Sequence, residues 1–145
     1  MRRMIKFPED VKINHKIYHN SGTKVKSLGS TVMWFALNLT DANGWYDNMV
    51  DDADESFLYE CTLKSGLKIA DYKTFDHDIN DLEVVLVGNP THEEVMNLEG
   101  VQTLIQKDYA GLVFSDYDPN DSQQDSDSLI LFNPRDSISN FKQIR

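Results

Sequence analysis

The residues best suited to chemistry are one histidine and several large aromatic side chains. His19 ends a run with strand character, residues 12–19, and Trp34 lies in a later run of β-branched and aromatic residues. Trp45 and Tyr46 follow on what we expect to be a short helix. An imidazole can hydrogen-bond a hydroxyl group, and an electron-rich ring can stack on a flat cation. Taken singly, each residue is more typical of a structural role, so their order along the chain carries the information.

The most polar stretch of the chain, residues 115–128, offers a second chemistry because it is rich in carboxylates. Its acidic and amide residues are spaced like the ligands of a calcium loop, at Asp116, Asp118, Asn120 and Asp127. Asp121 occupies the place that needs glycine, and strands rather than helices are expected on either side. A solvated, mobile acidic loop is therefore the favoured interpretation. The other histidines lack metal-ligand spacing and Cys61 is the single cysteine, so we expect no metal site.

Composition limits the classes of function. The chain has 145 residues, the size of one domain, which we place at residues 12–145 behind an N-terminal arm at residues 1–11. The net charge of -10 argues against the nucleic-acid backbone as a partner, because such a partner needs a basic face. A single cysteine permits no internal disulfide, which is typical of a reducing compartment, and no apolar run approaches the roughly 20 residues that span a bilayer. We therefore expect a cytoplasmic protein with no membrane partner.

The elements that must position these residues are short strands with few helices. Alternating or continuous apolar runs predict strands over residues 12–19, 31–37, 56–63, 67–71, 82–87, 111–114 and 129–132. One helix is expected to begin at a cap formed by Thr40 or Asp41, and another at Thr91, which has Glu94 three residues later. A further helix is expected over residues 99–108. Because strands and helices do not alternate strictly, the pattern predicts an α+β fold with a mixed or mostly antiparallel sheet.

The order of these segments is more specific than any one of them. An Ile-Tyr-His strand end meets a Ser-Gly-Thr turn, and a Trp-Phe-Ala strand and a helix bearing Trp-Tyr follow. Later come Asp-Tyr-Ala-Gly-Leu-Val-Phe, the polar stretch and Leu-Ile-Leu-Phe-Asn-Pro. This order, over residues 17–138, resembles the histidine-tyrosine-acid branch of the ADP-ribosyltransferase superfamily, as in poly-ADP-ribose polymerases and compact phage and bacterial relatives. The resemblance implies split mixed or antiparallel β-sheets with a few short helices.

The resemblance also implies that the turn after the first strand binds NAD⁺, which is the substrate of this family. His19 matches the family histidine, which hydrogen-bonds the adenosine ribose and belongs to the catalytic set. Asn20 stands where a glycine usually offers its backbone to the nicotinamide amide, so this position departs from the family pattern. Ser21 follows in the same expected binding turn.

Two aromatic positions correspond to rings that hold the nicotinamide in the family. Trp34 matches the tyrosine that stacks on the nicotinamide. Trp45 lies where a second stacking tyrosine sits on the following helix, with Tyr46 as the alternative. A tryptophan can replace a tyrosine there, because an electron-rich ring suits a cationic pyridinium.

The catalytic acid is the largest departure from the family. The family glutamate stands at the start of the closing strand, where this chain has Ser128, with Asp127 just before it. Asp127 is therefore our provisional acid, although its side chain is one methylene shorter. Such a carboxylate would stabilise the oxocarbenium-like transition state as nicotinamide leaves, an effect worth ~3–4 kcal/mol for a well-placed group.

Two functions follow from the resemblance, and the sequence leaves the choice between them open. The first is an NAD-dependent ADP-ribosyltransferase, a glycosyltransferase that moves ADP-ribose from NAD⁺ to a macromolecular acceptor. Such a compact chain is expected to be a toxin-like phage or bacterial effector that acts on a host protein, in the host cytosol if phage-encoded. The alternative is a catalytically degenerate domain with the same fold, acting as an acidic protein-interaction module or inhibitor.

Overall fold

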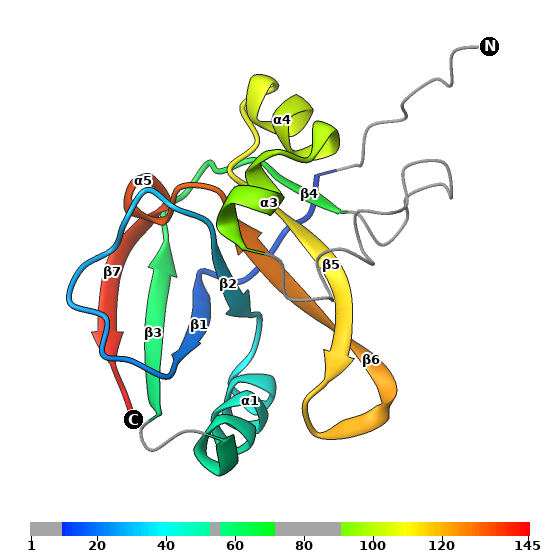
Figure 1. The fold of residues 1–145 in the computed structure, drawn as a ribbon. Helices are drawn as coiled ribbons and strands as arrows, with labels where there is room; N and C mark the ends of the chain where they lie inside the picture. The colour runs from blue at the N-terminus through cyan, green and yellow to red at the C-terminus, as the bar shows by residue number, and fades with distance from the viewer. Residues whose placement is uncertain (1–9, 53–55, 72–90) are drawn as a thin grey trace.

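The computed structural model describes residues 10–52, 56–71 and 91–145. Over these residues the fold is mixed α+β, which confirms the predicted class at that level (Figure 1). Most of the predicted N-terminal arm and the strand predicted over residues 82–87 lie outside the described residues. Within the same ranges, no helix is both long enough and apolar enough to cross a membrane.

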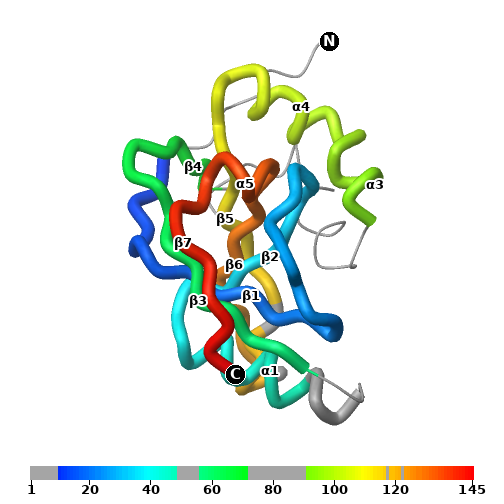
Figure 2. Tube along the Cα trace, turned by 90° about the vertical axis from the view of Figure 1, so that its left-hand side faces the viewer, coloured from blue at the N-terminus to red at the C-terminus, as the bar shows by residue number. Residues whose placement is uncertain are grey.

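Along the chain, the described elements start with two strands and end with a strand. The strands are β1 (Lys16–Ser21), β2 (Met33–Ala36), β3 (Phe57–Leu63), β4 (Ile69–Asp71), β5 (Gly111–Asp118), β6 (Asp121–Leu131) and β7 (Ile138–Gln143). The helices are α1 (Leu39–Asp52), α3 (His92–Met96), α4 (Glu99–Gln106) and α5 (Pro134–Ser137). Figure 1 shows α1 at the lower end of the sheet and α4 at the upper end, and Figure 2 keeps the same arrangement after a quarter turn.

The strands form one sheet in the order β4-β5-β6-β2-β1-β3-β7. β4 and β5 run parallel and the other neighbours are antiparallel, so the sheet is mixed. We expected split sheets, but hydrogen bonding joins all seven strands. The junction is narrow, because β1 and β2 share the single register pair Tyr18 with Ala36. The sheet therefore has two wide parts with a weak seam between them.

The polar stretch 115–128 is a β-hairpin, so the prediction of a mobile loop there is wrong. β5 and β6 continue past their apolar halves and pair residue by residue, for example Ser115 with Asp127 and Asp116 with Ser126. The turn lies between Asp118 and Asp121, whose Cα atoms are also paired. Ladder hydrogen bonds use backbone groups alone, so a two-stranded ribbon can be polar on its solvent-facing surfaces and still form. Composition misled the prediction at this point.

The capping signals were partly correct. Thr91 accepts a hydrogen bond from the backbone N–H of Glu94 at 3.2 Å, which confirms the predicted cap of α3. Helix α1, however, begins at Leu39, because the Asn38 side chain accepts from the backbone N–H of Asp41 at 2.8 Å. The cap is therefore Asn38 and not Thr40 or Asp41. Helix α5 and strand β7 were not predicted.

Three clusters of buried side chains hold the sheet and helices together. Helices α3 and α4 cover one face of β5 and β6, where the packed residues include Val95, Val101, Leu104, Leu112, Phe114 and Ile130. The opposite face is apolar over β1, β2, β3, β5 and β6, with Ile17, Phe35, Tyr59, Cys61, Val113, Leu129 and Leu131. Helix α1 packs against the seam through Ala42, which contacts Ala36 and Leu58. Burial of these apolar side chains provides the main stabilisation.

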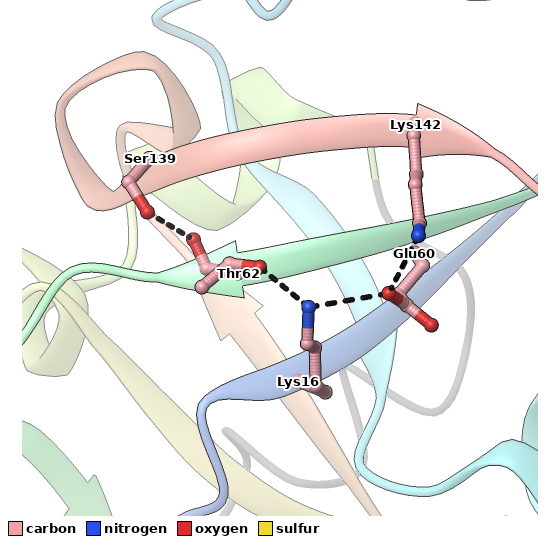
Figure 3. A network of polar contacts seen from close by, with 5 residues as sticks. All are labelled: Lys16, Glu60, Thr62, Ser139 and Lys142. Atoms are coloured by element: carbon pink, nitrogen blue, oxygen red, sulfur yellow. Dashed lines mark hydrogen bonds and ion pairs between the residues drawn. The ribbon is translucent and has the colours of Figure 1, made fainter.

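The outer surface of β1, β3 and β7 carries a polar network instead (Figure 3). The Glu60 carboxylate lies 3.2 Å from Lys16 Nζ and 3.5 Å from Lys142 Nζ. Lys16 Nζ also donates to Thr62 Oγ1 at 3.1 Å, and Ser139 Oγ donates to the Thr62 carbonyl at 3.3 Å. Side chains alternate across a strand, so this network and the apolar cluster use opposite faces of the same strands.

Candidate functional site

The candidate site lies where β1 and β2 separate. After the pair Tyr18 with Ala36, His19 and Asn20 continue in register with β3, whereas Phe35 and Trp34 continue in register with β6. The two strands therefore diverge from a common point. His19 Nδ1 bridges the opening, 2.7 Å from the carbonyl oxygen of Trp34.

A cavity of about 230 Å³ occupies this opening. Its walls combine aromatic and polar side chains from strands and from helix α1: Tyr18, His19, Asn20, Trp34, Phe35, Ala36, Trp45, Asp116 and Ser128. Binding sites for drug-sized ligands typically measure about 300–1,000 Å³. The cavity is thus large enough for one ring system and its immediate substituents, and a longer ligand would extend onto the surface.

The environment of His19 favours the neutral imidazole. A carbonyl oxygen can only accept, so Nδ1 carries the proton in the bond to Trp34 and Nε2 carries the lone pair. Burial lowers the pKa of His19, and the hydrogen bond to the Trp34 carbonyl partly opposes that effect. The rings of Phe35 and Tyr59 lie 5.5 Å and 6.5 Å away between centroids, which explains the desolvation. His19 can therefore accept a hydrogen bond from a hydroxyl group.

The two predicted stacking residues reach the cavity from different elements. Trp34 comes from β2 and packs against the cluster beneath α3 and α4. Trp45 comes from α1 and packs with Tyr18 against the seam residues. Tyr18 and Phe35, which were not among the predicted site residues, are two further aromatic residues of the wall. The structure thus brings together three predicted site residues that are separated in the sequence: His19, Trp34 and Trp45.

Asn20 also lines the cavity, whereas Ser21 and Tyr46 do not. Asn20 Nδ2 donates to the carbonyl of Ala42 at 3.1 Å and so ties β1 to α1. Ser21 Oγ is occupied in a local turn, where it donates to the carbonyl of Thr23 at 2.6 Å. The Tyr46 ring lies under the guanidinium of Arg145, 3.9 Å from its centroid. Of the alternatives on α1, Trp45 is therefore the residue placed at the site.

Asp127, the provisional acid, is not among the cavity-lining residues. It pairs with Ser115, and strand alternation directs it to the face opposite that of Ser128. Ser128 is 5% exposed and lines the cavity, beside Ala36 on one neighbouring strand and Phe114 on the other. The position that the sequence analysis expected to correspond to a glutamate is thus at the site, but it carries a hydroxyl group.

The sequence reasoning missed Asp116, the carboxylate that the structure places in the cavity wall. Ser128 Oγ donates to Asp116 Oδ2 at 3.3 Å. The two residues are diagonal neighbours on one face, since Ser128 is paired with Phe114, two residues before Asp116. Continuing the alternation of β5 beyond Phe114 would have predicted this placement, but the polar composition argued for a loop.

The tip of the β5–β6 hairpin contacts α1 and so borders the site. Asn48 Nδ2 donates to the Pro119 carbonyl at 3.2 Å, and Asn120 Nδ2 donates to the Thr40 carbonyl at 3.3 Å. Gly44 permits this approach, because a Cβ atom there would lie 2.6 Å from Asn120 Oδ1. The hairpin and the helix that carries Trp45 therefore hold one another in place.

The calcium-like spacing of the polar stretch does not produce a ligand cluster. Within the described ranges, no group of three or more His, Cys, Asp or Glu side chains could hold a metal ion. Two of the carboxylates cap the turn instead: Asp118 Oδ1 accepts from the Asn120 N–H at 2.8 Å, and Asp121 Oδ1 from the Gln123 N–H at 3.0 Å. These bonds are typical of Asx turns.

Comparison of the chain with protein-family models, curated proteins and solved structures finds no match.

Proposed function

We propose that the chain binds NAD⁺ by its nicotinamide end in this cavity and transfers ADP-ribose to a macromolecular acceptor. The observation that supports this most is the convergence of His19, Trp34 and Trp45 on one cavity. The three residues come from three different elements, β1, β2 and α1, and the resemblance to ADP-ribosyltransferases assigns all three to the NAD⁺ site.

The chemistry of the walls suits the nicotinamide riboside portion of NAD⁺. The pyridinium ring is flat and cationic, and contact with Trp34 or Trp45 would add about 0.5–2 kcal/mol through cation–π attraction. The unprotonated Nε2 of His19 would accept a hydrogen bond from a hydroxyl of the adenosine ribose, which is the contact that the resemblance implies. The cavity volume of about 230 Å³ is too small for the whole dinucleotide, so the adenine would lie along the surface.

A second function is favoured by one specific observation. Ser128 stands at the place of the family glutamate, is 5% exposed, and cannot carry negative charge near neutral pH. A chain that kept the pocket but lost the acid would bind NAD⁺ without cleaving it. A chain that also lost affinity for NAD⁺ would act through its surface, and a net charge of -10 favours a basic protein partner.

Titration calorimetry with NAD⁺, combined with an assay for released nicotinamide, separates these functions. We expect the wild type to bind and to release nicotinamide. His19→Gln should weaken binding about tenfold, because its amide cannot reproduce the ring geometry in which Nδ1 donates to the Trp34 carbonyl and Nε2 accepts from the ligand. His15→Gln is the matched control, since His15 is exposed just before β1 and outside the cavity.

Each alternative result has a clear meaning. Binding without release would identify a catalytically degenerate pocket. No binding at all would contradict the NAD⁺ assignment and leave the protein-interaction function. Circular dichroism of His19→Gln checks that the variant remains folded, so that a loss of affinity is not a loss of structure.

A further inference from the structure

The cavity wall contains one carboxylate among its described residues, and it belongs to Asp116. The other lining side chains are aromatic, aliphatic, amide, hydroxyl or the neutral imidazole of His19. A negative charge beside several aromatic rings attracts a flat cation, and it also stabilises positive charge that develops during a reaction. Asp116 is therefore the group on the wall with the chemistry of a catalytic acid residue.

Ser128 fixes the position of this carboxylate. Its hydroxyl donates to Asp116 Oδ2 at 3.3 Å, and the side chain is buried between strands β2 and β5. A buried hydroxyl on a paired strand has little freedom, so it restricts the orientation of its partner. The serine that replaces the family glutamate thus contacts a charge supplied by the adjacent strand.

We propose that Asp116, positioned by Ser128, is the carboxylate that promotes cleavage of NAD⁺, which makes the chain an active enzyme. This inference rests on the proposed function. During the step, the bond between ribose C1′ and the pyridinium nitrogen breaks, and its electron pair remains on nitrogen, so neutral nicotinamide leaves. The ribose acquires oxocarbenium character, which the Asp116 carboxylate stabilises. Water or another nucleophile then bonds to C1′ and releases a proton to solvent.

The other carboxylates of the hairpin are less suited to this role. Asp127 lies on the opposite face of β6, in register with Ser115. Asp118 and Asp121 accept backbone hydrogen bonds at the turn. Asp125 is exposed on β6 and does not line the cavity. The carboxylate of Asp116 on β5 therefore leaves a negative charge at the site, although β6 carries Ser128 there.

The test compares three variants of the full chain by nicotinamide release and by NAD⁺ calorimetry. Asp116→Asn keeps the shape of the side chain but removes its charge, and it should lower nicotinamide release by about 10²–10³-fold. Its affinity for NAD⁺ should change by far less. Asp125→Asn is the matched control on the same hairpin and should retain wild-type release. Asp127→Asn tests the competing acid and should also retain it.

The positioning role of Ser128 has a separate readout. Ser128→Ala should lower kcat by less than Asp116→Asn does, with KM nearly unchanged, because binding is retained while the carboxylate loses its orientation. Ser128→Thr keeps a hydroxyl group and should restore most of the rate. A purely structural role would instead change stability and KM together.

The outcomes distinguish this inference from the NAD⁺ proposal itself. Full release by Asp116→Asn, or a loss caused by Asp127→Asn, would overturn the assignment of Asp116 while the NAD⁺ site stands. Wild-type binding with no release would overturn it as well and favour the degenerate pocket. If the wild type does not bind NAD⁺, both the site and this assignment are wrong.

Discussion

The two faces of strands β1 and β3 favour different charge states of their titratable side chains. On the inner face, burial lowers the pKa of His19 and so disfavours its charged form. On the outer face, the hydrogen bond from Lys16 lowers the pKa of Glu60, assisted by Lys142 and opposed by desolvation, and this favours the charged form. The strands are the same, and alternation places these two side chains on opposite faces.

The difference shows why His19 is suited to binding and Glu60 to surface stability. Glu60 already has two cationic partners, so its charge is satisfied within the protein. His19 lines the cavity, uses one nitrogen for the Trp34 carbonyl and retains an acceptor on the other. A ligand hydroxyl can complete the hydrogen bonding of His19. An added ligand at Glu60 would have to compete with both lysines.

Truncation on the inner face should have the largest effect on stability. Phe35 is 2% exposed and its ring centroid lies 5.5 Å from that of His19. Phe35→Ala should reduce the free energy of unfolding by about 3–5 kcal/mol, because it leaves a cavity in the core. Urea denaturation measures the change, with Lys142→Ala on the outer face as control. A loss below ~1 kcal/mol would mean that the inner face is not tightly packed.

Adjacent residues of β3 allow a closer comparison of the two faces. Cys61 is fully buried, and burial raises the pKa of its thiol to about 12. Cys61→Ser places a more polar group in the same site and should cost about 1–3 kcal/mol of unfolding free energy. Thr62→Ser keeps the hydroxyl that Lys16 contacts at 3.1 Å on the outer face, so it should cost less than about 1 kcal/mol. Equal losses in thermal or urea unfolding would contradict the alternation.

Acidification should weaken the inner face before the outer one. The pKa of His19 is lowered in the folded state, so below its ordinary value of about 6.5 the unfolded chain binds more protons. Stability is therefore greatest above that value and falls as the pH decreases toward the lowered pKa. We expect a lower unfolding free energy at pH 5.5 than at pH 7.5, and a smaller decrease in His19→Gln. An identical decrease in the variant would assign the effect to other groups.

Sequence patterns located most of the inner face, because they report on alternation and residue type. The runs around Ile17, Phe35 and Cys61 predicted strands, and the structure has β1, β2 and β3 there. His19, Trp34 and Trp45 were selected through their order along the chain, and they line one cavity. The strand predictions are correct because alternation and residue type are local signals.

The sequence could not predict where strands separate or which polar residues pair across them. Helix α1 contacts the narrow β1–β2 seam through Ala42, whose carbonyl accepts a hydrogen bond from Asn20 of β1, and these contacts are non-local. Asp116 reaches the cavity only because the polar ends of β5 and β6 continue as a ladder. The polar composition favoured a loop there, because composition carries no information about which backbone segments pair. Local sequence patterns likewise do not predict the contact between the turn at Pro119 and α1.

Neutralising Glu60 should give the smallest change of all. In Glu60→Gln the two lysines lose their ion pairs but remain hydrated, because exposed pairs contribute little net stability. The folded-state pKa of Glu60 is lowered, so its contribution is present above the ordinary glutamate value of about 4.3 and disappears as the pH falls through the lowered pKa. The difference between wild type and variant in urea unfolding should therefore shrink below pH 4. It should also shrink at about 1 M salt, where the screening length is only ~3 Å. A large, salt-independent loss in Glu60→Gln would show that the outer network is as important to folding as the buried inner face.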